Sequence, residues 1–302
     1  MRFVIIGYGL LSSLIYESLK KKKKVLVLSR FKKSKHSLTN KDFFYYDINN
    51  LDQIEKKIKK DDIILFSAGP SEFELSKLNK KKISEYLYFY NEIIKLCIKV
   101  KVSQFIFFSS IKVYSKSKIY DEQAVTKATS KYSLLKINCE KIITNYYPTT
   151  TKFKIIRISN VFSEPLIFNK NYENLLIPSL IKSSLIKKSI CLKNPEICKD
   201  FLTFHDFNKK LIKVINDKDI NQMKVYNVGS YNSISILDIS LLIQKIIYKL
   251  YKIKINLRFP NRDKTTLIFN TKFLFLRTKS KINNLEIAIT KLILFLKDHY
   301  KN

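Results

Sequence analysis

The chain has 302 residues, 46% of them hydrophobic, so it is long and apolar enough to bury a sizeable core. Its formal net charge of +32 would ordinarily point to nucleic acid or an anionic membrane as a partner. Only six of its 57 basic residues are arginine, however, and lysine is spread through every segment. Nucleic-acid surfaces lean on arginine for paired contacts, so the composition argues against a nucleic-acid partner.

Cysteine and histidine give no sign of a metal site or a disulfide framework, because the four cysteines lack paired CxxC spacing and the three histidines lie far apart. The chain starts with a strand-like run and no leader pattern, so a cytoplasmic protein is expected. The most apolar late segment, 285–296, is interrupted by Lys291 and too short to span a bilayer. We expect a core-facing helix there, with a helix on a membrane surface or a partner as the alternative.

Short apolar runs alternate with helix-length intervals through the first half of the chain. Strands spaced in this way form crossover units, which give a parallel sheet. After Ser163 the rhythm breaks down, and a further strand and two helices close the chain. The predicted strands are 3–6, 25–28, 43–46, 63–66, 105–108, 153–158 and 225–228, and the late helices lie near 236–251 and 285–300.

Glycine is scarce, with four residues in the whole chain, and each glycine follows a predicted strand. Ligands bind at the carboxyl ends of strands in open parallel sheets. Residues 7–12 have the pattern GxGxxS and open a helix. Gly7 allows a tight turn, Gly9 lets the backbone approach a pyrophosphate, and the amides of Leu10 and Leu11 would face the phosphates. The alternative is an ordinary strand-to-helix turn, because Ser12 replaces the third glycine.

The end of the second strand indicates the cofactor. About twenty residues after Gly9, where an NAD site carries an acidic side chain, the chain has Ser29 and Arg30. A hydroxyl and a guanidinium suit a 2′-phosphate, which predicts NADP, with NAD less favoured; alternatively, Arg30 is an ordinary surface charge. Asp47 follows the third strand and would lie near the adenine or cap the next helix. The residues after the fourth strand, Ser67, Ala68 and Gly69, are also assigned to the cofactor.

A tyrosine followed four residues later by a lysine on one helix face has chemical meaning, because the ammonium stabilises the phenolate. The pattern alone is weak in so lysine-rich a chain, where it starts at Tyr16, Tyr114, Tyr132 and Tyr248. Only Tyr132, with Lys136, begins a predicted helix shortly after a strand that ends in a hydroxyl pair, Ser109 and Ser110. This context selects Ser110, Tyr132 and Lys136 as the candidate catalytic group.

Five short segments follow one another along the chain in an order that chance does not explain. Residues 105–115 read FIFFSSIKVYS, and residues 132–140 read YSLLKINCE, close to YxxSKxxxE. Residues 157–162, RISNVF, are similar to R-x-x-N-V-Y, and residues 199–206, KDFLTFHD, to RDFIHVDD. Residues 226–229 read YNVG. Together they resemble the extended short-chain dehydrogenase/reductases that modify nucleotide sugars.

The resemblance implies an α/β fold, a Rossmann-like doubly wound parallel sheet with a small interwoven C-terminal substrate lobe. The NADP-binding domain would comprise residues 1–163, with 200–230 returning to it, and the lobe 164–199 and 231–302. Tyr132 would be the general acid/base on the sugar oxygen, and Ser110 would hydrogen-bond the same oxygen. Lys136 would bind the nicotinamide ribose, and hydride would pass between nicotinamide and sugar.

The two residues after Ser110 indicate which of the family's reactions this chain is expected to catalyse. Sugar 4,6-dehydratases carry an Asp-Glu pair where this chain has Ile111 and Lys112, and 3,5-epimerase/reductases carry a Cys at the first of these positions. A 4-ketosugar reductase or a 4-epimerase with retained NAD(P) remains. Dissociable NADPH suits net reduction, so the reductase is favoured, in surface-polysaccharide sugar biosynthesis. A non-catalytic dinucleotide-binding protein is less favoured, because all three candidate catalytic residues are present.

The expected partner is a nucleotide-diphosphate sugar, with no nucleic acid and no membrane insertion, and a homodimer is allowed. The resemblance implies substrate contacts from Ser110 and Asn160. Arg262, followed by Asp263 and then by Asn-Thr-Lys at 270–272, is similar to the family's R-x-D and D-x-S-K tail. Arg262 is therefore a better candidate than Arg258 for a phosphate contact. The alternative is that both arginines are surface charges.

Overall fold

The computed structural model describes residues 2–30, 42–47, 50–114, 119–166, 168, 170–218, 223–230, 232–259, 272–273 and 282–300. The chain divides into two compact units. The first comprises residues 1–115, 122–158 and 212–227, and the second comprises 116–121, 159–211 and 228–302. Helix α8 (Phe204–Asn216) begins in the second unit and ends in the first.

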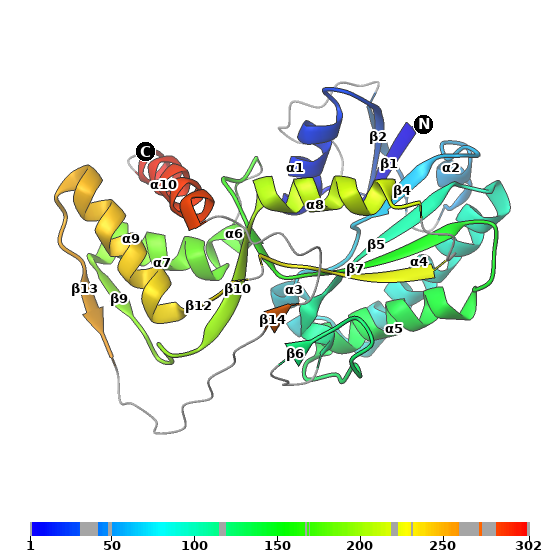
Figure 1. Ribbon diagram of the computed structural model, residues 1–302. Helices are drawn as coiled ribbons and strands as arrows, with labels where there is room; N and C mark the ends of the chain where they lie inside the picture. The colour runs from blue at the N-terminus through cyan, green and yellow to red at the C-terminus, as the bar shows by residue number, and fades with distance from the viewer. Residues whose placement is uncertain are drawn as a thin grey trace. The chain divides into compact units, whose positions relative to one another are not determined.

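The first unit is built on a seven-stranded sheet with the order β11-β7-β5-β4-β1-β2-β3 (Figure 1). The pairings that join β3, β2, β1, β4, β5 and β7 are parallel, which confirms the predicted doubly wound sheet. The strand order reverses between β1 and β4, and ligands bind at such a reversal in open α/β sheets. The strands are β1 (Arg2–Ile6), β2 (Lys24–Ser29), β3 (Phe43–Tyr45), β4 (Ile63–Phe66), β5 (Gln104–Ser110), β7 (Lys152–Ile158) and β11 (Met223–Val228).

Helices cover both faces of this sheet, which accounts for the unbroken apolar runs of central strands such as β1 and β4. All four residues of β4 are buried. Side chains of one face, among them Val4, Phe66 and Phe105, form a core cluster with residues of α4 and α5. Figure 1 shows α1 on the opposite side of the sheet from these two helices. The helices of this unit are α1 (Leu10–Leu19), α2 (Asp52–Glu55), α3 (Glu72–Ser76), α4 (Lys80–Val100), the 3-10 turn η1 (Ile111–Val113) and α5 (Lys131–Asn145).

Local side-chain contacts fix where the two long helices begin. The Asn79 side chain accepts a hydrogen bond from the Lys82 amide at the start of α4. Ser130 does the same for the Ser133 amide at the start of α5, at 3.1 Å, and the Ser133 hydroxyl accepts in return from the Ser130 amide at 2.9 Å. This reciprocal cap sets the residue at which α5 starts.

The second unit contains a three-stranded sheet, β12-β10-β8, in which β10 pairs in parallel with β8 and antiparallel with β12. These pairings group residues 200–211 with the second unit. Its strands are β8 (Asn160–Phe162), β10 (Cys198–Thr203), β12 (Ser233–Ser235), the pair β9 (Ser189–Cys191) and β13 (Asn256–Arg258), and the pair β6 (Ile119–Tyr120) and β14 (Lys272–Phe273). Its helices are α6 (Lys170–Glu173), α7 (Leu176–Lys187), α9 (Ile236–Tyr251) and α10 (Ile282–His299). Among the described helices, none combines the length and apolar character needed to cross a membrane.

Candidate active site

The turn after β1 packs directly against the loop after β4. Gly7 has a φ of +94°, a conformation that strains other residues. A Cβ at Gly7 would lie 2.4 Å from the amide nitrogen of Ala68, so the two loops approach this closely only because residue 7 is glycine. The Ser67 hydroxyl adds a hydrogen bond to the Gly7 carbonyl at 3.4 Å. Three predicted cofactor residues, Gly7, Ser67 and Ala68, therefore lie together where the strand order reverses.

Gly9 precedes the first residue of α1 and leaves space beside its backbone. Within the described part of the chain, no heavy atom outside its immediate neighbours lies within 4 Å of a Cβ built there. Ser12, which replaces the third glycine, is buried; its hydroxyl accepts from the Gly9 amide at 2.7 Å and donates to the Gly9 carbonyl at 3.2 Å. The serine thus closes the turn with its own side chain. The amides of Leu10 and Leu11 stand in the first helical turn, where amides lack intrahelical acceptors and can meet an anion.

Tyr86, for which the sequence predicted no role, holds the loop after β4. Its hydroxyl donates to the carbonyl of Ala68 at 2.9 Å. A Cβ at Gly69, which has a φ of +146°, would lie 2.9 Å from the same hydroxyl oxygen. Burial raises the pKa of Tyr86 well above its usual value, so the phenol remains a donor. In the sequence, Tyr86 is one more aromatic residue on an amphipathic helix, and nothing there distinguishes it from a core side chain.

Ser29 and Arg30 lie at the carboxyl end of β2. Ser29 is buried, Arg30 is exposed, and the Tyr46 amide donates to the Ser29 carbonyl at 3.1 Å. Burial raises the pKa of Tyr46 to about 12, and the charge of Arg30 opposes that rise. The Asp47 amide donates to the Gln53 side chain. Helix α2 begins at Asp52 and its N-cap position is occupied by Leu51, so Asp47 is not the capping residue of this helix, although its amide meets the Gln53 side chain in the first turn.

The candidate catalytic residues come from β5 and α5. Ser110 is the last residue of β5, and Tyr132 and Lys136 lie in the first two turns of α5. The Lys136 ammonium nitrogen lies 5.6 Å from the centre of the Tyr132 ring and donates to the carbonyl of Phe108 at 2.8 Å. Because Phe108 precedes Ser109 and Ser110, this hydrogen bond joins α5 to the end of β5.

A second ammonium lies near the same ring. The Lys112 nitrogen is 5.9 Å from the centre of the Tyr132 ring and forms an ion pair with Glu72 of α3. Both partners are exposed, so the pair adds little stability. By the sequence resemblance, Lys112 stands at one of the two positions where sugar 4,6-dehydratases carry carboxylates, and an ammonium cannot replace a carboxylate as the base for elimination.

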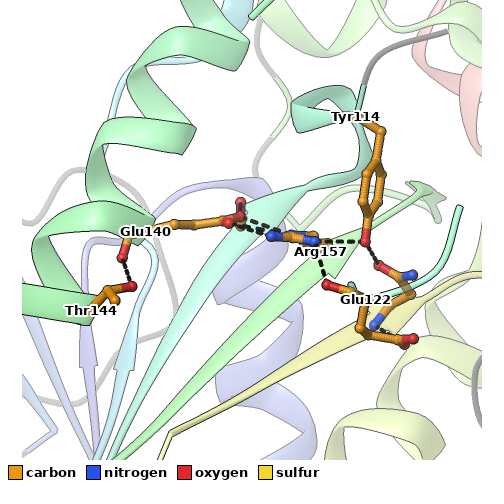
Figure 2. Close-up of polar contacts among 7 residues, drawn as sticks. Tyr114, Glu122, Glu140, Thr144 and Arg157 are labelled. Atoms are coloured by element: carbon orange, nitrogen blue, oxygen red, sulfur yellow. Dashed lines mark hydrogen bonds and ion pairs between the residues drawn. The ribbon is translucent and has the colours of Figure 1, made fainter. Parts of the chain in front are cut away.

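A buried polar network connects α5 with β7, and Figure 2 shows Glu140, Arg157 and Tyr114 in it. Ser109 donates to the carboxylate of Glu140 on α5, and the Arg157 guanidinium on β7 lies 2.7 Å from that carboxylate. Arg157 also donates to the Tyr114 hydroxyl at 2.8 Å, and Tyr114 donates to the Asn227 side chain at 2.6 Å. The sequence assigned no separate role to these residues, although Glu140 and Arg157 both fall in segments that resemble the family.

The predicted substrate residue Asn160 belongs to the second unit, where its side chain donates to the Asp200 carbonyl at 2.8 Å. The buried Asp200 carboxylate accepts from the Ser230 amide and hydroxyl. A Cβ at Gly229 would lie 3.1 Å from this carboxylate, which explains the glycine there. Arg258 ends β13 and is exposed, whereas Arg262 lies outside the described residues. Within the described ranges, no cluster of three or more His, Cys, Asp or Glu residues could hold a metal ion.

Several solved structures that are similar to this fold are nucleotide-sugar enzymes. A UDP-N-acetylglucosamine 4-epimerase from Methanobrevibacter ruminantium M1, in complex with UDP-N-acetylmuramic acid, is 17% identical, with a TM-score of 0.77 over 99% of this chain and 98% of that one. A UDP-glucuronic acid 4-epimerase from Bacillus cereus, in complex with NAD, is 18% identical, with a TM-score of 0.77 over 100% and 98%. An NAD-dependent NDP-hexosamine 5,6-dehydratase of tunicamycin biosynthesis is 17% identical, with a TM-score of 0.70 over 98% of both chains. At these identities the likeness shows the fold.

The sequence itself carries the family signature. None of the curated proteins matches the chain. The sequence profile of the NAD dependent epimerase/dehydratase family matches residues 4–229, well over half of the chain. This span runs from β1 to Gly229 and includes the glycine turn, the Tyr132 helix and the Arg157 segment. The chain therefore belongs to the NAD dependent epimerase/dehydratase family, enzymes of the extended short-chain dehydrogenase type.

Proposed function

We propose that this protein is an NADP(H)-dependent reductase of a nucleotide-linked 4-ketosugar, in the biosynthesis of surface-polysaccharide sugars. The observation that carries the proposal is the position of the Lys136 ammonium, 5.6 Å from the Tyr132 ring centre and 2.8 Å from the Phe108 carbonyl. A phenol and an ammonium beside a strand that ends in Ser110 are the groups needed to protonate a carbonyl oxygen.

The turn after β1 fits a dinucleotide. A Cβ at Gly9 would fill the space beside the backbone, and Gly7 allows the turn to lie against Ala68. The amides of Leu10 and Leu11 are placed at the positive end of α1, where a pyrophosphate is favoured. Bound there, the nicotinamide cofactor supplies the hydride for the sugar carbon.

Three side chains perform the rest of the reduction. Tyr132 donates its phenolic proton to the carbonyl oxygen of the sugar as the carbonyl carbon is reduced. Ser110 donates a hydrogen bond to the same oxygen and stabilises the charge that develops on it. Lys136 stabilises the phenolate that Tyr132 becomes, and it also binds the nicotinamide ribose.

The choice of NADP rests on the end of β2. Ser29 and the exposed Arg30 stand where an NAD site would carry a carboxylate, and a guanidinium is a strong partner for a 2′-phosphate. NAD remains the competing cofactor, because the similar structures of MoeE5 with UDP-glucose and of the Bacillus cereus UDP-glucuronic acid 4-epimerase are complexes with NAD.

A nucleotide-sugar 4-epimerase is the second candidate function. The observation in its favour is that two similar structures of nearly the same length are described as 4-epimerases. In this reaction Tyr132 removes a proton from the sugar hydroxyl and later returns it, so the same three side chains suffice. The chemical difference is that hydride returns to the opposite face of the sugar carbon, with no net use of cofactor.

Two assays on the purified protein separate these functions. With a nucleotide-linked 4-ketosugar, the reductase consumes one NADPH per sugar reduced. With a UDP-hexose and NAD, an epimerase converts the sugar to its 4-epimer while the total cofactor stays oxidised. Tyr132→Phe should lower either activity by roughly 100-fold or more while cofactor affinity changes little. Near-full activity in this variant on a confirmed substrate would remove Tyr132 from the mechanism.

The diphosphate of the sugar nucleotide is assigned to Arg262, with Asn160 as a further substrate contact. Arg262→Ala should raise the Michaelis constant for the sugar nucleotide by about tenfold or more, as expected when a charge-assisted contact of roughly 1.5–3 kcal/mol is lost. NADPH binding should be unaffected. Arg258→Ala, four residues earlier, is the matched control and should leave the Michaelis constant unchanged. If the Michaelis constant were unchanged in both variants, Arg262 would not be a substrate contact.

A further inference from the structure

Lys136 lies between two oxygen-bearing side chains on one face of α5. Tyr132 precedes it by four residues and Glu140 follows it by four, and residues spaced in this way are neighbours on a helix. Opposite charges at this spacing attract, although the order with the lysine first is the weaker of the two. The Lys136 ammonium instead donates to the Phe108 carbonyl at 2.8 Å, on the side of α5 that faces β5.

The Glu140 carboxylate is already fully engaged. The Arg157 guanidinium donates to it from Nη2 at 2.7 Å and from Nε at 3.2 and 3.3 Å, and Ser109 donates to Oε1. The two charged side chains are only 9% and 7% exposed, so water does not screen them. Arg157 therefore neutralises Glu140 at the point where Glu140 would otherwise compete for Lys136.

Arg157 is itself fixed from its other side. Its Nη1 donates to the Tyr114 hydroxyl at 2.8 Å and to the Glu122 carbonyl at 3.2 Å (Figure 2). Burial opposes the charge of Arg157, but its hydrogen bonds and ion pair with Glu140 outweigh burial and raise the pKa of the guanidinium. The charge that neutralises Glu140 is therefore permanent and cannot swing away.

We propose that Arg157 and Glu140 are positioning residues for the Tyr132 and Lys136 pair: Arg157 neutralises the carboxylate that would otherwise draw the Lys136 ammonium one turn along α5, away from Tyr132 and the Phe108 carbonyl. The inference rests on the proposed function only in taking Lys136 as the group that serves Tyr132 and the cofactor. Glu140 in turn holds the end of β5 through Ser109, next to Ser110.

Removal of Arg157 and then of its partner tests this arrangement. In Arg157→Gln the Glu140 carboxylate is left uncompensated, so its crystal structure should show the Lys136 ammonium moved from Phe108 to Glu140. Its kcat should fall at least tenfold, and its dissociation constant for the cofactor should rise. In the double variant Arg157→Gln, Glu140→Gln no carboxylate competes. Lys136 should return to Phe108, and most of the lost kcat and cofactor affinity should return with it.

An ion pair at the amino ends of β1 and β4, in the same sheet, provides the control. Arg2 donates to Asp62 from Nε at 3.0 Å and from Nη2 at 2.6 Å, and Asp62 is 3% exposed. Arg2→Gln also leaves a buried carboxylate uncompensated, so it should lower the melting temperature as Arg157→Gln does. Its kcat and cofactor affinity, measured well below that temperature, should match those of the unmodified protein.

The outcomes separate this inference from the proposed function. If Lys136 remains on Phe108 in Arg157→Gln, or if the folded double variant is no better than the single variant, the positioning role is overturned. Should Arg157→Gln fail to fold, the double variant decides alone, because the inference requires it to retain most activity and cofactor affinity. If no assay detects turnover by the unmodified protein, the proposed function fails, while the Lys136 position and the cofactor affinities still decide the inference.

Discussion

The phenol of Tyr86 donates a hydrogen bond to the carbonyl oxygen of Ala68 at 2.9 Å, so a side chain of α4 holds the loop that follows β4. The Tyr86 hydroxyl oxygen would lie 2.9 Å from a Cβ at Gly69, so this position requires glycine. This loop packs against the glycine turn after β1, because Gly7 leaves room for the Ala68 backbone. One tyrosine thus fixes two of the segments assigned to the cofactor.

Tyr86→Phe removes this hydrogen bond and keeps the ring. The dissociation constant for the cofactor should rise about two- to tenfold, the equivalent of a hydrogen bond of about 0.5–1.5 kcal/mol, in a fluorescence titration. Tyr88→Phe is the control, since Tyr88 lies on the same helix and is 67% exposed. Unchanged affinity in Tyr86→Phe would mean that the loop holds its shape without the phenol.

Tyr90 carries a different kind of hydroxyl. Its ring packs in the core 4.9 Å from Phe66 and 5.1 Å from Phe107, and within the described residues its hydroxyl is buried without a hydrogen-bond partner. An unpaired buried polar group costs about 1–3 kcal/mol, so Tyr90→Phe should raise the free energy of unfolding by about 1 kcal/mol. Tyr146→Phe should lower it, because the Tyr146 hydroxyl donates to Asn91 at 2.9 Å. Denaturant titration of both variants checks the opposite signs, and a loss of stability in both would reveal a partner for Tyr90.

The buried strands could be read from the sequence because both faces of the sheet are covered. Strand β4 occupies 63–66 and helix α9 occupies 236–251, as predicted, since each is a sharply bounded apolar pattern. The short strands of the second unit could not be predicted in the same way. Strand β12 is Ser-Ile-Ser, and it is a strand because β10 lies beside it. Its sequence alone carries no strand signal.

The candidate site was also predictable from the sequence only in part. The GxGxxS turn and the Tyr132 pattern are local, so they could be proposed from the sequence, although the Tyr132 pattern was selected only by the preceding strand that ends in a hydroxyl pair. The contact between Glu140 and Arg157 depends on how α5 packs against β7, and that packing has no local signature. The hydrogen bond by which Ser12 closes the turn could not be predicted from the spacing either, because the spacing identified only a small residue in place of a glycine.

Cofactor preference is expected to depend on Arg30. NADPH should bind at least several-fold more tightly than NADH, and Arg30→Ala should remove much of the difference because a charge-assisted phosphate contact is lost. NADH affinity should change little in the same variant. Lys60→Ala, which removes an exposed charge before β4, should preserve the preference. Equal affinities of the unmodified protein for the two cofactors would contradict the NADP assignment.

Lys154 gives the first unit a specific dependence on pH. Its side chain is on β7 and is only 4% exposed, and its ammonium donates to the carbonyl oxygens of Val214, Ile215 and Asp217 at 2.7, 3.1 and 3.1 Å. These carbonyls lie at the end of α8, so the lysine binds the helix terminus to the sheet. Burial lowers the pKa of Lys154 to about 8, and the charge of Asp217 opposes this shift.

Between pH 8 and the ordinary lysine value of 10.5, the unfolded chain keeps a proton on residue 154 that the folded chain has released. The unfolded state then binds more protons, so this residue makes the free energy of unfolding rise with pH across that window. Below pH 8 the full cost of burying the ammonium is present.

Lys154→Met should destabilise the protein, because three carbonyls lose their donor. The difference in free energy of unfolding between the unmodified protein and this variant should widen by an amount on the order of 2 kcal/mol from pH 7.5 to 10.5. Urea titrations of both proteins at several pH values measure this difference, in which the titrations common to both chains cancel. Lys141→Met, at an exposed lysine on α5, should give a curve parallel to that of the unmodified protein. If the Lys154→Met curve were parallel as well, the residue would keep its ordinary titration in the folded chain.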